Sequence, residues 1–225
     1  MDNETTNTQE VTLFLQDLLS SSTITVRFSY VHVILALFNF AENSDGMGRY
    51  TLGKVLNIGE GMSRSIVTKF QEKNIISRKS QRKGHILTPE GKRLYEQVKR
   101  HIFYLGSAPD LCKNIIVKGQ PYLCFVRGGA DRIGLGIEAR DAAIKIGGYG
   151  ATCLVFQQGC LRFPHDDTLL DPRIQDSLIK ITPLEEGDVI IIGAGENEAI
   201  ARLAALNAAL SITNLIPKKN TVGIP

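Results

Sequence analysis

Apolar side chains in the first hundred residues recur at three- and four-residue steps, which is the spacing of one helix face. The clearest pattern predicts a strong helix over 26–40, formed by Phe28, Val31, Ile34, Leu35 and Phe38. The same spacing predicts helices over 11–19, 60–73 and 90–104, with a short helix before the glycines of NIGEG. Residues 1–9 are polar and lack the pattern, so we expect a disordered tail there.

Two short strand-like segments lie between the last two of these helices. NIISRKS predicts one strand, SQRKG a turn and HILT the partner strand, so a β-hairpin is expected over 75–88. Gly84 permits the chain to reverse, and Arg82 and Lys83 lie at the tip. The hairpin is therefore predicted to carry positive charge at its exposed end.

The helix after the hairpin has a clear start signal. The Thr88 hydroxyl can accept from an unpaired amide of the first turn, and Pro89 suits a first helical position that needs no amide hydrogen. Glu90 places a carboxylate at the positive helix end. The order helix, turn, helix, basic hairpin and capped helix is typical of a winged helix-turn-helix, which we place over 10–105.

The pattern of apolar and polar residues changes after GSAPD, whose turn-forming residues predict a linker at 106–110. Strand-like YLCFVRG is followed by the helical segment GIEARDAAIKIG, the hairpin ATCLVFQQGCLRFP, and the strand GDVIIIGAG leading into the helix ENEAIARLAALNAAL. Alternating strands and helices predict a small α/β or α+β domain over 111–225. We expect this domain to sense an effector or to hold a dimer together.

Positive charge gathers in one region of the chain. Residues 64–101 hold 11 Lys and Arg against 3 Asp and Glu, whereas the rest of the chain holds 15 against 20. Such asymmetry favours contact between the basic region and a polyanion, although a solvated basic surface would look the same by charge alone. The position of the charge on a predicted hairpin favours double-stranded DNA as the partner.

The four cysteines, Cys112, Cys124, Cys153 and Cys160, contain no C-x-x-C pair, so no zinc site is expected. We also expect no cofactor, and we interpret His32 as a hydrogen-bonded structural histidine rather than a ligand. The polar start of the chain is unlike a signal peptide, and no apolar run approaches the roughly 20 residues that span a bilayer. A reduced cytoplasmic location without membrane contact is therefore expected.

The segments GRYTLGKVLNIGEGMSRSIVTKFQEKNIISR and HILTPEGKRL resemble winged-helix transcription regulators of the MarR-like type, over roughly 26–104. With GIEARDAAIKIG and GDVIIIGAGENEAIARLAALNAAL, the whole chain resembles archaeal two-domain predicted regulators whose C-terminal domain is uncharacterised. The resemblance implies this fold order and a regulatory role. Two positions depart from the pattern: Ser63, where such helices bury an apolar residue, and Met62, which is larger than usual.

The helix at 60–73 is predicted to enter the major groove, and the hairpin at 75–88 to contact the backbone. Arg64 can pair with guanine or clamp a phosphate, and the neighbouring hydroxyls can donate or accept hydrogen bonds. For any one residue, plain solvent exposure is an equally good interpretation. The predicted DNA contacts are Met62, Arg64, Ser65, Thr68, Lys69, Arg78, Lys79, Arg82, Lys83 and His85.

The G-x-G step between the last strand and the last helix is a weak signal for a nucleotide site. The dinucleotide fingerprint requires glycine where this chain has Glu198, so a plain strand-to-helix turn is the better interpretation. Charged residues around 136–147 could line an effector pocket, yet ion pairs on a helix surface explain them equally well. The candidate effector residues are Arg127, Glu138, Arg140, Asp141, Gly193, Gly195 and Asn197.

Three functions remain open on the sequence, in decreasing order of support. The first is a DNA-binding regulator, acting as a homodimer on two half-sites and responding to a possible small-molecule effector. The second is a winged-helix interaction module of the transcription machinery, in which the basic face is dispensable. The third is a small-molecule enzyme in 111–225, which no catalytic motif supports, so we expect no enzyme.

Overall fold

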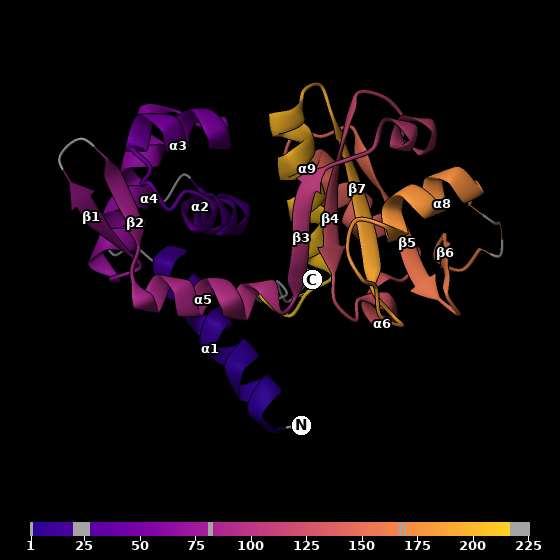
Figure 1. Ribbon diagram of the computed structural model, residues 1–225, viewed down its shortest axis with the longest axis horizontal. Helices are drawn as coiled ribbons and strands as arrows, with labels where there is room; N and C mark the ends of the chain where they lie inside the picture. Colours follow the sequence, from indigo (N-terminus) through magenta and orange to yellow (C-terminus); the bar gives the residue numbers. More distant parts are fainter. Residues whose placement is uncertain (1, 20–27, 81–82, 167, 169, 217–225) are drawn as a thin grey trace, which may run out of the picture.

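The computed structural model describes residues 2–19, 28–80, 83–166, 168 and 170–216, which form a two-domain α+β protein (Figure 1). The N-terminal domain is helical with one small hairpin and contains α1 (Asp2–Leu19), α2 (Tyr30–Glu42), α3 (Arg49–Leu56), α4 (Glu60–Glu72), β1 (Ile76–Ser80), β2 (Gly84–Leu87) and α5 (Pro89–Lys99). The C-terminal domain contains β3 (Ile102–Ser107), η1 (Asp110–Ile115), β4 (Gln120–Val126), α6 (Ala130–Ile133), α7 (Ile137–Lys145), β5 (Gly150–Gln157), β6 (Cys160–Arg162), α8 (Pro172–Ile179), β7 (Val189–Gly195) and α9 (Glu198–Ser211).

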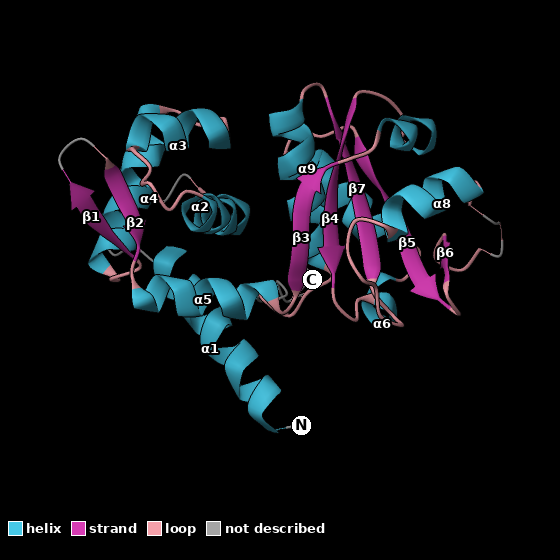
Figure 2. Ribbon diagram, in the orientation of Figure 1, coloured by secondary structure: helices cyan, strands magenta, loops and turns pink. Residues whose placement is uncertain are grey.

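The C-terminal domain is built on a five-stranded sheet in the order β3-β4-β7-β5-β6 (Figure 2). Every neighbouring pair is antiparallel, so the domain is α+β, and the parallel α/β alternative was wrong. Side chains of β4 alternate between two buried clusters: Cys124 faces the α9 side and Leu123 faces the α8 side. Because both faces are covered, the central strands are continuously apolar instead of alternating with polar residues.

Helix α9 lies between the sheet and the N-terminal domain (Figure 1). It packs on β4 and β7 with one side and on α2 with another, and its alanines and leucines are buried on both. Gly193 of β7 makes the close approach possible, because a Cβ there would lie 2.2 Å from the backbone nitrogen of Ala205. The two domains therefore share one continuous apolar core through α9.

Helix α2 is the centre of the N-terminal domain. Every residue from 31 to 40 is buried, a wider burial than the single stripe expected from the sequence. The reason is that α2 packs against α5 and α3 within its own domain and against α9 of the other domain. On the α5 side, the rings of Phe38 and Tyr95 meet edge to face at 5.2 Å.

His32 belongs to the N-terminal cap of α2. The Ser29 amide donates to Nδ1 of His32 at 3.2 Å, and burial lowers the pKa of this imidazole. A protonated Nδ1 could not accept that bond. The interpretation of His32 as a hydrogen-bonded structural histidine is confirmed.

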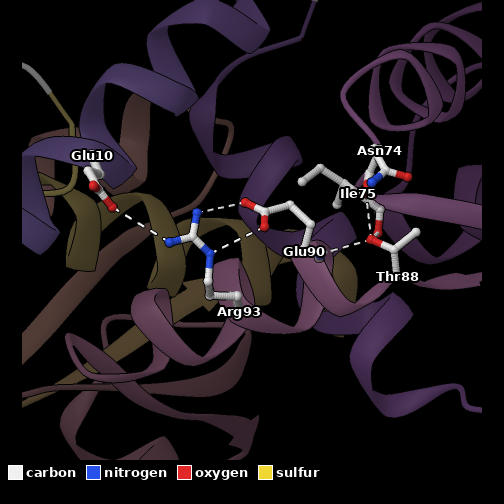
Figure 3. A network of polar contacts seen from close by, with 7 residues as sticks. Glu10, Asn74, Ile75, Thr88, Glu90 and Arg93 are labelled. Atoms are coloured by element: carbon white, nitrogen blue, oxygen red, sulfur yellow. Dashed lines mark hydrogen bonds and ion pairs between the residues drawn. The ribbon is translucent and has the colours of Figure 1, made fainter.

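The junction from the hairpin into α5 is fixed by Thr88, as the sequence predicts. Its hydroxyl accepts from the Gly91 amide at 3.0 Å and donates to the carbonyls of Asn74 and Ile75 (Figure 3). A Cβ on Gly91 would lie 2.1 Å from the Ile75 carbonyl oxygen, so only glycine fits there. Helix α5 is thereby held against the start of β1.

Arg93, one turn further along α5, connects α5 to α1. Its guanidinium contacts Glu90 at 2.8 Å and Glu10 of α1 at 3.7 Å (Figure 3). Helix α1 also buries Val11 and Leu15 in the N-terminal core. It begins at Asp2, so the structure has helix over most of the segment expected to be a disordered tail at 1–9.

The boundary between the domains lies near residue 101 and not at 106–110. β3 occupies the end of the predicted helix 90–104 and the first two residues of the predicted linker, and η1 begins at its last residue. Ile102 of β3 pairs with Val126 of β4. Leu94, Val98 and Ile102 have helical spacing, but 102–105 is a run of β-favouring residues. Pairing with β4 overrides the helical spacing. Within the described residues, every helix is too short or too polar to cross a bilayer.

Replacing Gly193 with alanine tests the packing of α9 on the sheet. The new methyl group would meet the backbone of α9, so Gly193→Ala should lower the free energy of unfolding by roughly 2 kcal/mol or more in a urea titration. Gly61→Ala is the matched control, because nothing lies within 4 Å of that position. It should leave stability unchanged or raise it by up to about 1 kcal/mol. Equal stability of both variants would contradict the close packing.

Replacing His32 with glutamine tests the buried imidazole. Because burial lowers the pKa of His32, the unfolded chain binds its proton more tightly. The stability that neutral His32 contributes is fully present above a pH of about 6.5, the pKa of histidine in the unfolded chain. This stability is lost as the pH falls through the pKa of His32 in the folded protein. His32→Gln keeps a capping-box acceptor without a titratable group. Urea unfolding between about pH 7.5 and about pH 5.5 should show a smaller loss of stability in this variant than in the wild type; an identical loss would contradict the assignment.

Candidate nucleic-acid interface

Helices α3 and α4 meet at a tight turn. Asn57 ends α3 in the left-handed conformation (φ 54°), and the Ile58 amide donates back to the Gly53 carbonyl at 2.9 Å. Gly59 then caps α4 in an extended conformation. The two helices approach closely, because a Cβ on Gly53 would lie 3.2 Å from the Ser63 hydroxyl oxygen.

The unusual serine at position 63 follows from this close approach. Ser63 is fully buried against α3, and its hydroxyl donates to the Glu60 carbonyl at 3.0 Å. A larger apolar residue at position 63 would approach Gly53 of the facing helix. Met62 is half-buried and packs against the core rather than projecting fully outward, so less of its side chain is exposed than the sequence predicts.

The outward face of α4 carries the predicted contact residues. Arg64, Ser65 and Thr68 are exposed, and Lys69 is half-buried. Arg64 reaches Glu60, one turn earlier, with a 2.9 Å contact between exposed groups. An ion pair this exposed is weak, so the guanidinium can exchange it for another anion at little cost.

The hairpin β1–β2 lies beside α4 and is braced by a third chain segment (Figure 1). Met47 pairs with His85 of β2, each amide donating to the other's carbonyl at 2.8 and 2.9 Å. Gly84 (φ 76°) permits the approach, because a Cβ there would lie 2.4 Å from the Met47 oxygen. Sequence reasoning missed this bridge, although the glycines flanking Met47 are a signal for it.

The cationic side chains of the hairpin differ in whether they pair with neighbouring groups of the protein. Arg78 and Lys83 are exposed, whereas Lys79 donates to the Ser44 carbonyl at 2.8 Å and lies 3.8 Å from the Asp45 carboxylate. Lys79 is thus partly neutralised by the loop before Met47. The predicted contact Arg82 lies outside the described residues.

His85 lies on β2 close to the turn of the hairpin, opposite Arg78 of β1. Burial lowers the pKa of His85, and the nearby Arg78 lowers it further, while a backbone hydrogen bond with Met47 raises it. Its Nδ1 is buried and has no partner within the described part of the chain. This environment favours a neutral, half-buried His85 beside Met47 rather than a charged contact residue.

The cations of the basic region, residues 64–101, lie on several different elements of the fold. Four of these cations, Lys92, Arg93, Lys99 and Arg100, lie on α5 or directly after it and not on α4 or the hairpin. Lys73 pairs with Asp17 of α1. The charge beside α4 is therefore smaller than the local count of the sequence suggests, and it rests mainly on Arg64, Lys69 and the hairpin.

Arg49 and Tyr50 adjoin the face of α4 and were not among the predicted contacts. The Arg49 guanidinium lies 4.8 Å from the centre of the Tyr50 ring and 3.8 Å from the Glu60 carboxylate. Tyr50 is one of the exposed large side chains of the described residues. The signal in the sequence is an arginine and an aromatic residue at the start of a helix, directly after Gly48.

Arg127 is separated from the two glycines among the candidate effector residues, whereas Arg140 lies beside Gly150, which pairs with Ala194 of β7. Arg127 lies just beyond the end of β4, where it contacts the fully buried Asp188 at 2.7 Å and Glu185 at 3.0 Å. Gly193 and Gly195 lie at the other end of the paired strand β7. The remaining charged candidates, Glu138, Arg140 and Asp141, are on α7.

The glycines of the G-x-G step serve packing in this structure. A Cβ on Gly195 would lie 2.5 Å from the Ala201 nitrogen, so α9 fills the space that a ligand would need. Asn197 caps α9 by accepting from the Ile200 amide at 3.0 Å. These contacts favour the plain strand-to-helix turn over a nucleotide site. In the residues that the structure describes, no cluster of His, Cys, Asp and Glu could hold a metal ion.

The cysteines behave as apolar core residues. Cys112, Cys124 and Cys153 are buried and Cys160 is half-buried, and none forms a disulfide with another of the four. Burial raises the pKa of the Cys112 thiol to about 11 and that of Cys153 to about 12, and it raises that of Cys124 further. Thiols with such values are not activated nucleophiles.

Substitutions at Ser63 test the close approach of α3 and α4. Ser63→Leu should overpack the contact with Gly53 and lower the free energy of unfolding by about 1–3 kcal/mol in a denaturant titration. Ser63→Ala removes one local hydrogen bond and should cost only about 1 kcal/mol or less. A leucine variant as stable as the alanine variant would show that the junction has room.

Comparisons with known proteins match the two halves of the chain separately. Residues 32–93 match the family described as PH0730-like, N-terminal domain, and residues 117–212 match the Domain of unknown function (DUF4443). The structure of the hypothetical protein PH0730 from Pyrococcus horikoshii OT3 is similar at 26% identity and a TM-score of 0.64, over 81% of this chain and 91% of that chain. No curated protein matches. The chain is therefore similar, over both of its domains, to a two-domain archaeal protein.

Proposed function

We propose that this protein is a DNA-binding transcriptional regulator. In this proposal the N-terminal domain is a winged helix-turn-helix, with α4 in the major groove, the β1–β2 hairpin on the backbone and the C-terminal domain regulating the contact. The observation that carries the proposal is the exposed polar face of α4 beside a hairpin that presents Arg78 and Lys83.

The chemistry of the α4 face supports base recognition. Arg64 can donate two hydrogen bonds to a guanine edge, and Thr68 can donate to or accept from either partner of a base pair. The Ser65 hydroxyl donates to the Gly61 carbonyl at 3.0 Å and keeps its lone pairs as acceptors. Because Glu60 pairs with Arg64 on the surface, a guanine or phosphate must displace that carboxylate.

The bracing of the hairpin supports a role on the phosphate backbone. The Met47 bridge ties β2 to the chain segment that leads into α3, so the hairpin and the α3–α4 pair are held as one unit. Because the two elements are already held in place, less conformational entropy is lost when both bind one duplex. Contacts of this kind position the protein, whereas α4 supplies the sequence preference.

Direct contact between the domains supports a regulatory role for the C-terminal domain. The Arg202 guanidinium of α9 donates to the Val55 carbonyl at the end of α3, and α9 also packs on α2. A movement of α9 would therefore act on the helix that precedes α4. A small-molecule effector of the C-terminal domain would use this route.

Two copies of such a domain commonly bind half-sites about 34 Å apart on one face of the duplex. We therefore expect a homodimer on DNA. If the alternative of a protein-interaction module holds, DNA binding is absent and charge reversal at Lys83 leaves partner binding intact. If an enzyme resides in the C-terminal domain, that activity survives the same change.

DNA selection from a random duplex library, followed by binding titrations, tests the proposal. Arg64→Ala should raise the Kd for the selected sequence about tenfold or more, and should raise that for random DNA much less. Lys83→Ala should weaken both and reduce the slope of log K against log salt by about 1.

Lys113→Ala is the control for the loss of one positive charge, because Lys113 pairs with Asp110 in the C-terminal domain. It should leave both affinities unchanged. Failure of the wild-type protein to select any sequence would contradict the proposal. Equal losses for Arg64→Ala and Lys83→Ala on selected and random DNA would contradict the assigned roles.

A further inference from the structure

Helix α7 exposes an apolar stripe on the surface of the C-terminal domain. Ile137 and Ile144 are 52% and 48% exposed, and Leu135, just before the helix, is 67% exposed. Residues seven apart on a helix lie almost on one line along its axis. On the opposite side of α7, Ala139 and Ala143 are buried within the domain. The exposed stripe is thus the solvent-facing side of a helix whose opposite side packs within the domain.

Two opposite charges flank this stripe symmetrically. At 3.6 residues per turn, Arg140 lies about 50° to one side of the line through Ile137 and Ile144, and Asp141 about 50° to the other. The two charges stand at nearly the same height, midway between the isoleucines. Within one chain their side chains approach to 3.4 Å, and the side chains are 58% and 47% exposed.

We propose that this face of α7 is the contact surface for a second copy of the chain. In the proposed dimer a twofold axis runs parallel to the two α7 helices, and Ile137 and Ile144 of each copy pack on their equivalents. Rotation about that axis exchanges the two sides of the stripe. Arg140 of each copy then stands beside Asp141 of the partner, and two ion pairs flank the apolar contact.

The charges select both the partner and the direction of packing. A twofold axis perpendicular to the helices would pack them antiparallel and would not exchange the two sides of the stripe. Arg140 of each copy would then lie beside Arg140 of the other, and Asp141 beside Asp141, and both contacts are repulsive. The stripe with its flanking charges therefore complements itself in the parallel arrangement, as a twofold interface requires. A strongly acidic or basic partner would match only one of the two flanking charges.

The proposal is independent of DNA binding and goes beyond it. Helix α7 packs against α9 and β5, whereas the N-terminal domain meets the C-terminal one mainly through α2 and α9. The proposed contact therefore does not use α4 or the hairpin. It would hold the protein as a dimer with or without DNA.

Light scattering after gel filtration, or sedimentation, of the full chain tests the proposal. The wild-type protein should have twice the mass of one chain. Ile144→Glu should raise the dimer dissociation constant about 100-fold or more, because it buries an unpaired carboxylate. Arg140→Asp should raise it about tenfold, and Arg140→Asp combined with Asp141→Arg should restore it to near the wild-type value.

Leu13→Glu is the matched control, because Leu13 is 64% exposed and lies on α1 of the N-terminal domain. It should leave the dimer intact, and thermal unfolding should show that all of these surface variants fold. A monomeric wild-type protein, a dimer that survives Ile144→Glu, or a charge exchange that does not restore the dimer would each overturn the proposal. Loss of the dimer in Leu13→Glu alone would assign the contact to α1 instead.

Discussion

The packing of α9 between the sheet and the N-terminal domain is the constraint on which the rest of the structure depends. The alanines of α9 and the glycine at 193 bring the helix backbone next to the backbone of β7. The opposite side of the same helix meets α2, which is buried along its whole middle section. The position of the α3–α4 pair is therefore set by the C-terminal domain as well as by its own core.

Most elements of this fold could be predicted from the sequence because their signals are local. The start of α5 at Pro89 follows from the cap chemistry of Thr88, and the hairpin follows from Gly84 between two short strands. The strand β3 could not be predicted, because Ile102 continues a helical spacing and its pairing with β4 is a long-range contact. For the same reason, the Met47 bridge to the hairpin was missed.

The candidate interface was predicted in outline, but its electrostatics depend on tertiary contacts. Arg64 and Thr68 lie on the exposed face as their spacing on the helix requires. The partial neutralisation of Lys79 by Asp45 joins residues that are far apart in the sequence. The spacing of residues within one helix or strand cannot indicate a contact of this kind. Likewise, Ser63 departs from an apolar pattern at the point where it packs against Gly53 of the facing helix.

The passage from α5 into β3 has a mechanical consequence. Only Arg100 and His101 separate the last residue of α5 from the first residue of β3. So short a segment keeps the end of α5 close to the first residue of β3. Because α2 also packs on α9, a small sliding of α2 across α9 would tilt the N-terminal domain relative to the sheet.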